Sequence, residues 1–419
     1  MHRSSCVIVG ASAAGISAAL ALRRLDYRGT ITVVDGDPHP PYERPPLSKA
    51  LLDDTTGGLV PIVPWSTYAD LEIDLRLGER VTAIDPGALK VHLGGGEQLD
   101  VDRLVLATGV TARHLALPHA DADNVLTLRD ATDAARLSAQ LARGGPLVII
   151  GAGFIGLELA AVARQRGIDV TVVEAQPRPL ANIVGPEVAS LVVDLHRGHG
   201  VRLITGATVE RFAATGSTVE QVVLSTGHRL DTATVVVGIG VQPRTELGTS
   251  ARVDVDHWGF PVNEFGQTSR AWIFAAGDVA SQAHPHLATR GRLEHWDTAQ
   301  RHGAAVGSTV AGEPVRYKEA PYAWSDQYDA TLQIIGRPRG TDQVVIREGA
   351  TPQRFLAFWL RDGRLAAAAG MDASREIGIA RRLVASTVLV DNAVLADAAT
   401  DLRALLKPHR PRSPEQLAG

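Results

Sequence analysis

The stretch that decides the fold is LVIIGAGFIG, residues 147–156. Its four leading apolar residues predict a buried strand, and the glycines that follow predict a tight turn that opens a helix. An Ala/Leu-rich segment comes next, and VTVVE, residues 170–174, predicts a second buried strand that ends in a carboxylate. A strand, a glycine turn, a helix and a strand in this order form the βαβ unit that binds a dinucleotide.

A second copy of the pattern lies nearer the N-terminus. VIVGASAAG, residues 7–15, precedes an Ala/Leu-rich stretch and ITVVD, residues 31–35. Ser12 stands where the middle glycine lets the backbone approach the pyrophosphate. This weakens the motif without removing it, because a small hydroxyl residue still permits close approach. The cofactor contacts expected from the two turns are Gly10, Ser12, Ala14, Gly15, Gly151, Gly153, Ile155 and Gly156.

The carboxylates at the strand ends constrain which dinucleotides fit. Asp35 and Glu174 can accept a hydrogen bond from a ribose 2′-OH, whereas a 2′-phosphate at the same place would be repelled. Glu174 therefore favours NADH over NADPH, although Arg178 could partly offset the repulsion.

The rest of the chain predicts further strands and a third domain. Apolar segments at residues 104–106, 235–237 and 272–275 each stop at or near a glycine. After about residue 318 the pattern changes. Residues 332–335, 343–346 and 354–359 predict strands, Asp362-Gly363 predicts a hairpin turn, and residues 376–385 predict a helix. The tail, residues 407–414, is expected to be disordered.

We therefore expect an α/β fold with two Rossmann-like dinucleotide-binding domains and a C-terminal α+β domain. The first dinucleotide domain is expected at residues 1–112 and 243–317, the second at 113–242, and the C-terminal domain at 318–419.

Composition excludes several classes of function. The formal charge of −4 and the pI near 6.4 give no basic footprint for nucleic acid. The single cysteine, Cys6, cannot form an internal disulfide, ligate an Fe–S cluster or build a Cys-rich zinc site, so no metal site is expected. It is expected to be a buried structural thiol. Residues 146–163 approach the length of a membrane span, but they carry three glycines and Glu158. With no signal peptide visible, a cytoplasmic protein is expected.

Five short motifs carry a resemblance to a known family. ATG at residues 107–109 and GD at 277–278 resemble the glutathione-reductase superfamily, in which the N-terminal unit holds FAD and the inserted unit holds NAD(P)H. RPPLSK at 44–49, RLEHW at 292–296 and YAWSDQY at 322–328 resemble ferredoxin reductases of the putidaredoxin-reductase type, which serve haem monooxygenases and aromatic-ring dioxygenases. The likeness covers nearly the whole chain.

The resemblance implies cofactors and contacts. FAD would occupy the first dinucleotide domain and NADH the second, and Asp278 would hydrogen-bond the FAD ribityl chain. The FAD contacts that it implies are Arg44, Lys49, Val81, Arg129, Asp278 and Trp296. The other cofactor contacts expected are Ala107, Gly109, Gly240, Gly277, Glu294 and His295.

Three residues are candidates for the chemistry. Lys49 is expected near the flavin N5 edge, where a cation stabilises an anionic reduced flavin. Glu158 lies in an apolar helix start and needs a polar partner, which is either Lys49 or the nicotinamide carboxamide. The resemblance places Trp324, with Trp296, near the exit for electrons, as a conduit or a docking aromatic; core packing is the alternative for Trp324.

The absence of a cysteine pair bears on the electron acceptor. Thiol-based reductase chemistry is excluded, so electrons must leave the flavin directly to an external acceptor. We expect a 2Fe-2S ferredoxin, with the chain a monomer or weak dimer. Ferredoxins are usually acidic, so an arginine-lined docking face is expected. Its candidates are Arg290, Arg292, Arg301, Arg316, Arg337 and Arg339.

Two other functions share every cofactor residue. One is an NADH oxidase or quinone reductase, with a small molecule or dioxygen as acceptor. The other is a redox-controlled interaction protein that resembles apoptosis-inducing factor.

Overall fold

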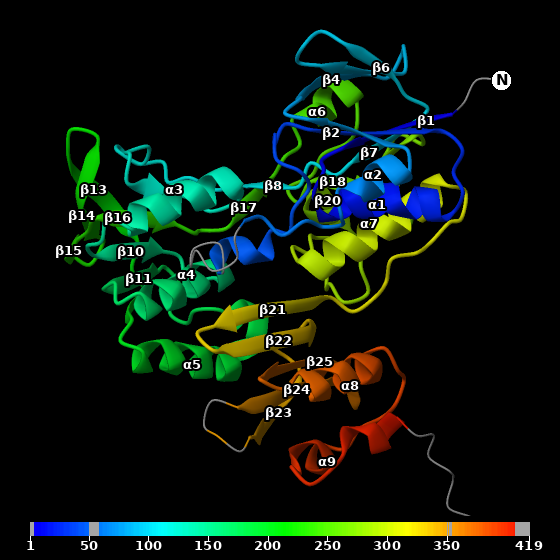
Figure 1. Cartoon of the computed structure of the whole chain (residues 1–419). Helices are drawn as coiled ribbons and strands as arrows, with labels where there is room; N and C mark the ends of the chain where they lie inside the picture. Colours follow the sequence, from blue (N-terminus) through cyan, green and yellow to red (C-terminus); the bar gives the residue numbers. More distant parts are fainter. Residues whose placement is uncertain (1–3, 50–57, 350, 352–353, 407–419) are drawn as a thin grey trace, which may run out of the picture. The chain divides into compact units, whose positions relative to one another are not determined.

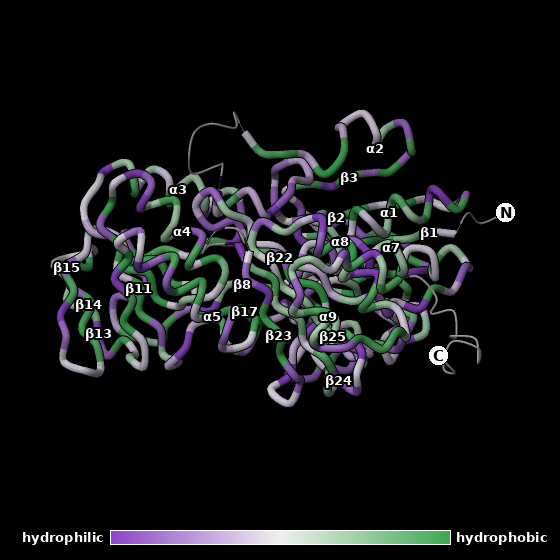
Figure 2. Tube along the Cα trace, turned by 90° about the horizontal axis from the view of Figure 1, so that it is seen from below, coloured by the Kyte–Doolittle hydropathy of each residue, from purple (hydrophilic) through white to green (hydrophobic). Residues whose placement is uncertain are grey.

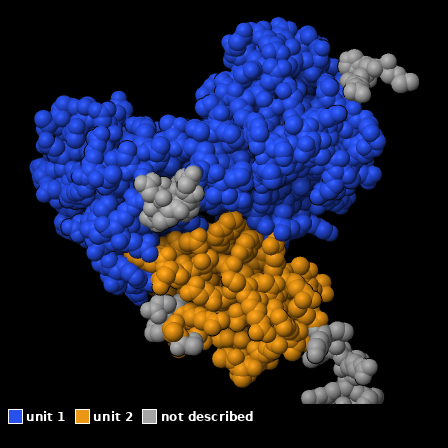
Figure 3. All heavy atoms as spheres, in the orientation of Figure 1, with its two compact units in different colours: residues 1–180, 192–321 blue, residues 181–191, 322–419 orange. Residues whose placement is uncertain are grey.

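The computed structural model describes residues 4–49, 58–349, 351 and 354–406, so the tail expected to be disordered lies outside the described residues. The chain divides into two compact units, which Figure 3 colours separately. The first unit comprises residues 1–180 and 192–321, and the second comprises residues 181–191 and 322–419. Both predicted dinucleotide folds lie in the first unit except for residues 181–191, which belong to the second unit together with the C-terminal domain.

The first dinucleotide fold is a parallel sheet with the strand order β19-β7-β1-β2-β3. Its strands are β1 (Ser5–Val9), β2 (Thr30–Asp35), β3 (Ile73–Leu77), β7 (Arg103–Leu106) and β19 (Ile273–Ala275). Helix α1 (Ala13–Arg24) lies beside α7 (Trp296–Val310) (Figure 1). The two helices approach closely because Gly303 has no side chain: a Cβ there would come within 2.1 Å of the Ala14 carbonyl oxygen.

The second fold repeats this architecture, with the parallel order β12-β11-β10-β16-β9. Its strands are β9 (Val125–Leu126), β10 (Leu147–Ile150), β11 (Val170–Glu174), β12 (Arg202–Thr205) and β16 (Thr234–Val237). Its helices are α3 (Ala131–Leu141), α4 (Phe154–Gln165) and α5 (Ala181–Gly198). Both predicted βαβ units are therefore present, each with its glycine turn between the first strand and the helix.

Strand β8 (Val110–Ala112) pairs antiparallel with β17 (Val241–Pro243). The chain therefore leaves the first fold and returns to it through neighbouring strands, which is how one dinucleotide fold is inserted into the other. The pair lies at the predicted junctions near residues 112 and 242.

Two small antiparallel sheets were not predicted. Their strands are β4 (Val81–Asp85), β5 (Lys90–Leu93), β6 (Gln98–Asp100), β13 (Val209–Thr215), β14 (Thr218–Leu224) and β15 (Arg229–Asp231). The short elements of this unit are η1 (Pro45–Ser48), α2 (Ser66–Asp70), α6 (Leu247–Ala251), β18 (Phe260–Val262), η3 (Gly277–Val279) and β20 (Ala280–Gln282).

The second unit is built on an antiparallel sheet with the order β21-β22-β25-β24-β23. Its strands are β21 (Tyr322–Gln327), β22 (Ala330–Gly336), β23 (Gln343–Glu348), β24 (Phe355–Arg361) and β25 (Arg364–Met371). Its remaining helices are α8 (Ser374–Val384), α9 (Asn392–Ala396) and η4 (Leu402–Leu406). The predicted strands, hairpin and helix are all present; strand β21 was quoted as a motif but not predicted as a strand.

The apolar run at residues 146–163 is divided between β10 and the start of α4. Hydrophobic (green) and hydrophilic (purple) segments are interspersed along the trace in Figure 2. Among the helices that the structure describes, none combines the length and hydrophobicity needed to cross a membrane.

Candidate active site

The first glycine of each turn is required by both conformation and space. Gly10 has φ +113° and Gly151 has φ +103°, values that residues with a side chain rarely adopt. A Cβ on Gly10 would come within 2.2 Å of the Ala107 carbonyl oxygen, and one on Gly151 within 2.3 Å of the Gly238 oxygen. These two glycines therefore hold each turn against the neighbouring strand end.

The third glycines serve helix packing. A Cβ on Gly15 would come within 1.8 Å of the Gly10 oxygen, and one on Gly156 within 2.2 Å of the Gly151 oxygen. The middle position is different, since a Cβ on Gly153 would have no atom within 4 Å. Open space before the N-terminus of α4 is what a pyrophosphate needs.

The carboxylates at the strand ends brace the turns. One oxygen of Asp35 accepts a hydrogen bond from the Ala11 amide at 2.6 Å, and one oxygen of Glu174 accepts from the Ala152 amide at 2.8 Å. Carboxylate oxygens have further lone pairs, so both residues can still bind a ribose hydroxyl. The sequence predicted the ribose contact, but not this brace.

Glu174→Gln is expected to lower the preference for NADH over NADPH about tenfold, because the variant removes the negative charge that repels a 2′-phosphate. The measurement is kcat/KM with each nucleotide. FAD content should stay at the wild-type level, since the residue belongs to the second fold. An unchanged ratio would show that Glu174 does not face the ribose.

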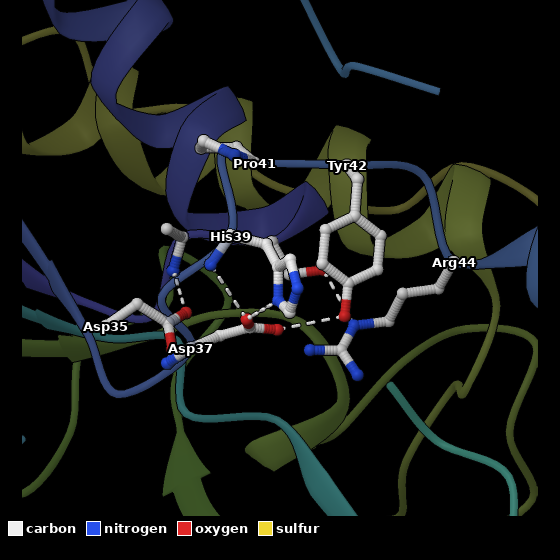
Figure 4. Close-up of a pocket in the computed structure, with 8 residues that line it drawn as sticks. Asp35, Asp37, His39, Pro41, Tyr42 and Arg44 are labelled. Carbon is white, nitrogen blue, oxygen red and sulfur yellow. Dashed lines mark hydrogen bonds and ion pairs between the residues drawn. The ribbon is translucent and has the colours of Figure 1, made fainter. Parts of the chain in front are cut away.

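A pocket beside the first turn is shown in Figure 4. It is lined by Ala11, Ser12, Asp35, Asp37, His39, Pro41, Tyr42 and Arg44. Asp37 accepts hydrogen bonds from the Tyr42 hydroxyl at 2.9 Å and from the His39 amide at 3.0 Å. Burial alone would raise the pKa of Asp37, but these hydrogen bonds outweigh it and hold the pKa below its usual value. The pocket thus combines two carboxylates, which suit ribose hydroxyls, with one arginine.

A second cationic group adjoins this pocket. Arg44 Nη1 donates to the Arg129 carbonyl oxygen at 2.7 Å, and Arg129 Nη2 donates to Asp278 Oδ2 at 3.2 Å. Burial and, next, the charge of Arg44 lower the pKa of Arg129. Its buried Nε has no hydrogen-bond partner among the residues described. Two guanidinium groups with an unused buried donor fit an anionic ligand, and the pyrophosphate of FAD is such a ligand.

The predicted pairing of Glu158 with Lys49 is present. Lys49 follows the short helix η1, and its side chain is 16% exposed; Glu158 lies on α4 with its side chain 7% exposed. The ammonium nitrogen is 3.6 Å from Oε1 of Glu158, and the Ser48 hydroxyl donates to Oε2. The pair joins a segment of the first fold to helix α4 of the inserted fold. Ser48 stood inside a quoted motif, but nothing in the sequence singled it out.

A buried histidine supports the Gly277-Asp278 turn, and the sequence did not reveal it. His302 Nδ1 accepts the Gly277 amide hydrogen at 3.3 Å, so this nitrogen is unprotonated. The ring stacks on Tyr317, and His284 lies on that tyrosine at a centroid distance of 5.2 Å. Burial lowers the pKa of His302 to about 3 and that of His284 to about 4.

The two buried histidines predict acid instability. Both stay neutral in the folded chain, whereas in the unfolded chain each binds a proton below pH of about 6.5. The free energy of unfolding should therefore fall by about 1.4 kcal/mol per pH unit for each histidine as pH drops from 6.5 toward 4. Urea unfolding of the FAD-bound protein at pH 7 and pH 5 measures this. His302→Gln should show a shallower fall, and an equal slope in both proteins would contradict the assignment.

The other expected contacts lie in several places. Ala14 and Ala107 are buried beside the first turn, Val81 opens β4, and Gly109 and Gly240 have positive φ. Gly277 packs on Ala14, Ile155 is 39% exposed on α4, and Glu294 pairs with Arg292.

His295 precedes α7. Trp296 is the first residue of α7 and packs against the core of the first fold. Trp324 lies on β21 of the second unit and stacks on Tyr322 at 5.9 Å.

The prediction that six arginines line an exposed docking face is wrong for Arg292, which is buried. Several of the other arginines are already bound to partners within the chain. Arg292 is only 5% exposed at its side chain, because it pairs with Glu294 and donates to the Trp258 carbonyl oxygen. Arg301 pairs with Asp297 and Glu319, Arg316 pairs with Glu264, and Arg290 donates to two carbonyl oxygens. These partners offset or occupy the arginines, a tertiary effect that the sequence did not show. Arg337 and Arg339 lie in the second unit.

Cys6 lies within β1, is 1% exposed, and has its pKa raised to about 12 by burial. A thiol with that pKa is not a thiolate nucleophile at neutral pH, in agreement with the structural thiol expected.

Comparisons with known proteins place this site in a family. The pyridine nucleotide-disulphide oxidoreductase family matches residues 4–303, and the reductase C-terminal family matches residues 322–406. Rhodocoxin reductase of Rhodococcus erythropolis is 35% identical over 99% of this chain and 97% of its own length. The chain belongs to the pyridine nucleotide-disulphide oxidoreductases. Within this family it is similar to ferredoxin–NAD(+) reductases, among them the anthranilate 1,2-dioxygenase component of Burkholderia cepacia, 38% identical over 97% of this chain and 100% of that protein.

Solved structures of ferredoxin reductases are also similar to this chain along nearly its whole length. The ferredoxin reductase for the CYP199A2 system of Rhodopseudomonas palustris superimposes with a TM-score of 0.92 at 35% identity, covering 96% of this chain and 99% of that one. The reductase in a covalent putidaredoxin reductase–putidaredoxin complex superimposes with a TM-score of 0.91 at 33% identity, covering 97% and 99%. Membership of the family confirms the two dinucleotide-binding domains with a C-terminal domain, and FAD and NADH as the cofactors.

Proposed function

We propose that this pyridine nucleotide-disulphide oxidoreductase is an FAD-containing ferredoxin–NAD(+) reductase that passes electrons to a 2Fe-2S ferredoxin. FAD would be held by residues 1–112 and 243–317, and NADH by residues 113–242. The ferredoxin would in turn serve a haem monooxygenase or an aromatic-ring dioxygenase, as the names of the relatives suggest.

The observation that carries the proposal is the group formed by Ser48, Lys49 and Glu158. It joins the segment after the first glycine turn to the helix of the second, which supports a position near the place where the two bound cofactors would exchange electrons. When bound, FAD accepts a hydride from NADH and releases electrons one at a time. Lys49 would supply a positive charge at this place, and Glu158 would hold the Lys49 ammonium in position through their ion pair.

Other residues of the chain hold the cofactors. Arg44 and Arg129 supply charge for the FAD pyrophosphate, and Asp35 and Glu174 bind ribose hydroxyls. Asp278 is proposed to bind the ribityl chain while it orients Arg129, with which it pairs at 3.2 Å.

The acceptor is proposed to be external because the chain has no internal one. Cys6 is the single cysteine and is buried, so no thiol relay is available. The relatives include a reductase solved in complex with its ferredoxin, which supports a protein acceptor. We propose Trp324 as the aromatic that contacts the incoming ferredoxin. A monomer or weak dimer in the cytoplasm stays a prediction.

The test is NADH-dependent turnover of the FAD-bound protein with three acceptors: a 2Fe-2S ferredoxin from the same genome, a soluble quinone and oxygen. Turnover with the ferredoxin should exceed that with oxygen or quinone by at least about 100-fold in kcat/KM. A higher rate with quinone or oxygen would favour the oxidase or quinone reductase. Because one relative is a rubredoxin–NAD(+) reductase of Pseudomonas putida, 35% identical over 81% of this chain, a rubredoxin belongs in the same assay.

A further inference from the structure

The two glycine turns differ in the side chain at their middle position. Ser12 and Gly153 both precede a helix, α1 and α4, and both have extended backbone, with φ −97° and −77°. Neither position requires glycine for its backbone conformation. A serine in this place normally accepts a hydrogen bond from an amide in the first turn of its helix. Ser12 makes no such bond.

The Ser12 hydroxyl is used by an arginine instead. It accepts a hydrogen bond from Nε of Arg44 at 3.1 Å. Arg44 is held on two further sides, by the Arg129 carbonyl oxygen at 2.7 Å from Nη1 and by the Tyr42 ring, whose centroid is 5.9 Å from the guanidinium carbon. Its Nη2 donates to no other residue within the part of the chain that the structure describes.

A second guanidinium group lies close to Arg44. Arg129 has a buried, unpartnered Nε and pairs with Asp278, while Asp35 and Asp37 line the same pocket as Arg44. The amides at the start of α1 are not capped by Ser12, and they add partial positive charge. Two arginines and uncapped helix amides match a diphosphate group.

We propose that Ser12 is a positioning residue for FAD: its hydroxyl fixes the Arg44 guanidinium and leaves Nη2 and the charge for the cofactor's pyrophosphate. On this proposal, the serine at the middle position contributes to FAD binding, and it is more than a harmless substitute for glycine. The inference rests on the assignment of FAD to the first turn in the proposed function. The NADH turn keeps glycine at this position, which suits a nucleotide that must leave in every catalytic cycle.

The test is a double-mutant cycle on FAD retention. Wild type, Ser12→Ala, Arg44→Met and the double variant are diluted as FAD-bound proteins, and free FAD is measured by its fluorescence. Ser12→Ala should raise the dissociation constant about five- to tenfold, which is the size expected for the loss of one ordinary hydrogen bond. In the Arg44→Met background the same change should have less than about a twofold effect.

Matched variants separate the hydroxyl from other effects. Ser12→Gly should lose as much affinity as Ser12→Ala, and Ser12→Thr should keep most of it. Ser217→Ala removes an exposed hydroxyl that donates to Asp123 and should leave FAD affinity unchanged. Thermal unfolding at saturating FAD checks that each variant folds.

Two outcomes would overturn the inference. Equal losses with and without Arg44 would mean that Ser12 acts on the cofactor directly, and no loss in Ser12→Ala would mean that the hydroxyl has no role. Neither outcome depends on the electron acceptor, because the cycle measures only how tightly FAD is held. If ferredoxin failed as a substrate, the FAD dissociation constants would still show whether Ser12 acts through Arg44.

Discussion

Glu158→Gln is expected to slow reduction of the bound flavin by NADH about 10- to 100-fold. Glutamine keeps the size of the side chain and can still accept a hydrogen bond from Ser48, so the main change is the lost negative charge. The mostly buried Lys49 ammonium then loses the carboxylate that lies 3.6 Å away, and removing one member of a buried ion pair is strongly unfavourable. Lys49 should therefore no longer be held at the junction of the two folds. Anaerobic stopped-flow mixing with NADH, followed by flavin absorbance, measures the rate.

Control variants separate charge at this site from charge elsewhere. Glu220→Gln removes an exposed carboxylate on β14 and should leave the rate unchanged. Ser48→Ala should have a smaller effect than Glu158→Gln, because Glu158 keeps its charge and its pairing with Lys49. A Glu158→Gln rate within about twofold of wild type would remove Glu158 from the mechanism.

Gly151→Ala is expected to lower the free energy of unfolding by more than about 3 kcal/mol, or to prevent folding of the inserted domain. The new Cβ would be 2.3 Å from the Gly238 oxygen, on a backbone with φ +103°. Neither backbone segment can move without disturbing the strand end that it belongs to. Urea unfolding, or the yield of soluble protein, measures the effect.

Gly153→Ala is the matched comparison. Its Cβ meets no atom within 4 Å, so stability should change by less than about 0.5 kcal/mol. The methyl group would occupy space that the pyrophosphate needs, so KM for NADH should rise about tenfold. Equal stability of the two variants would contradict the packing described for Gly151. An unchanged KM in Gly153→Ala would place the NADH pyrophosphate elsewhere.

The sequence predicted the parts of the fold that repeat a local pattern. Both βαβ units were predicted from runs of apolar residues and glycine spacing, since a buried parallel strand and a tight turn each leave a local signature. The small sheets of β4–β6 and β13–β15 were missed. Their strands are short and half-exposed, so they lack a continuous apolar run.

The sequence predicted those candidate site residues whose own side-chain chemistry points to a role. It missed residues whose role is visible only from the residues that they contact in the fold. Lys49 and Glu158 were paired from the cost of burying a lone carboxylate. Ser48 and His302 act through contacts with residues far away in the chain, and such contacts exist only after folding. Asp37 contacts its near neighbours His39 and Tyr42, but no motif in the sequence singled it out. Arg292 shows the reverse case, because an arginine that reads as exposed in the sequence is buried against Trp258.

The most direct test of the central claim is a single turnover without oxygen. The FAD-bound protein is reduced with one equivalent of NADH and mixed with a 2Fe-2S ferredoxin, and the iron–sulfur absorbance is followed in wild type and in Cys6→Ala. We predict that about two ferredoxins are reduced per NADH, because each accepts one electron, and that both proteins react at the same rate. A flavin that NADH reduces, but that stays reduced with ferredoxin until quinone or oxygen is added, would contradict the proposed function.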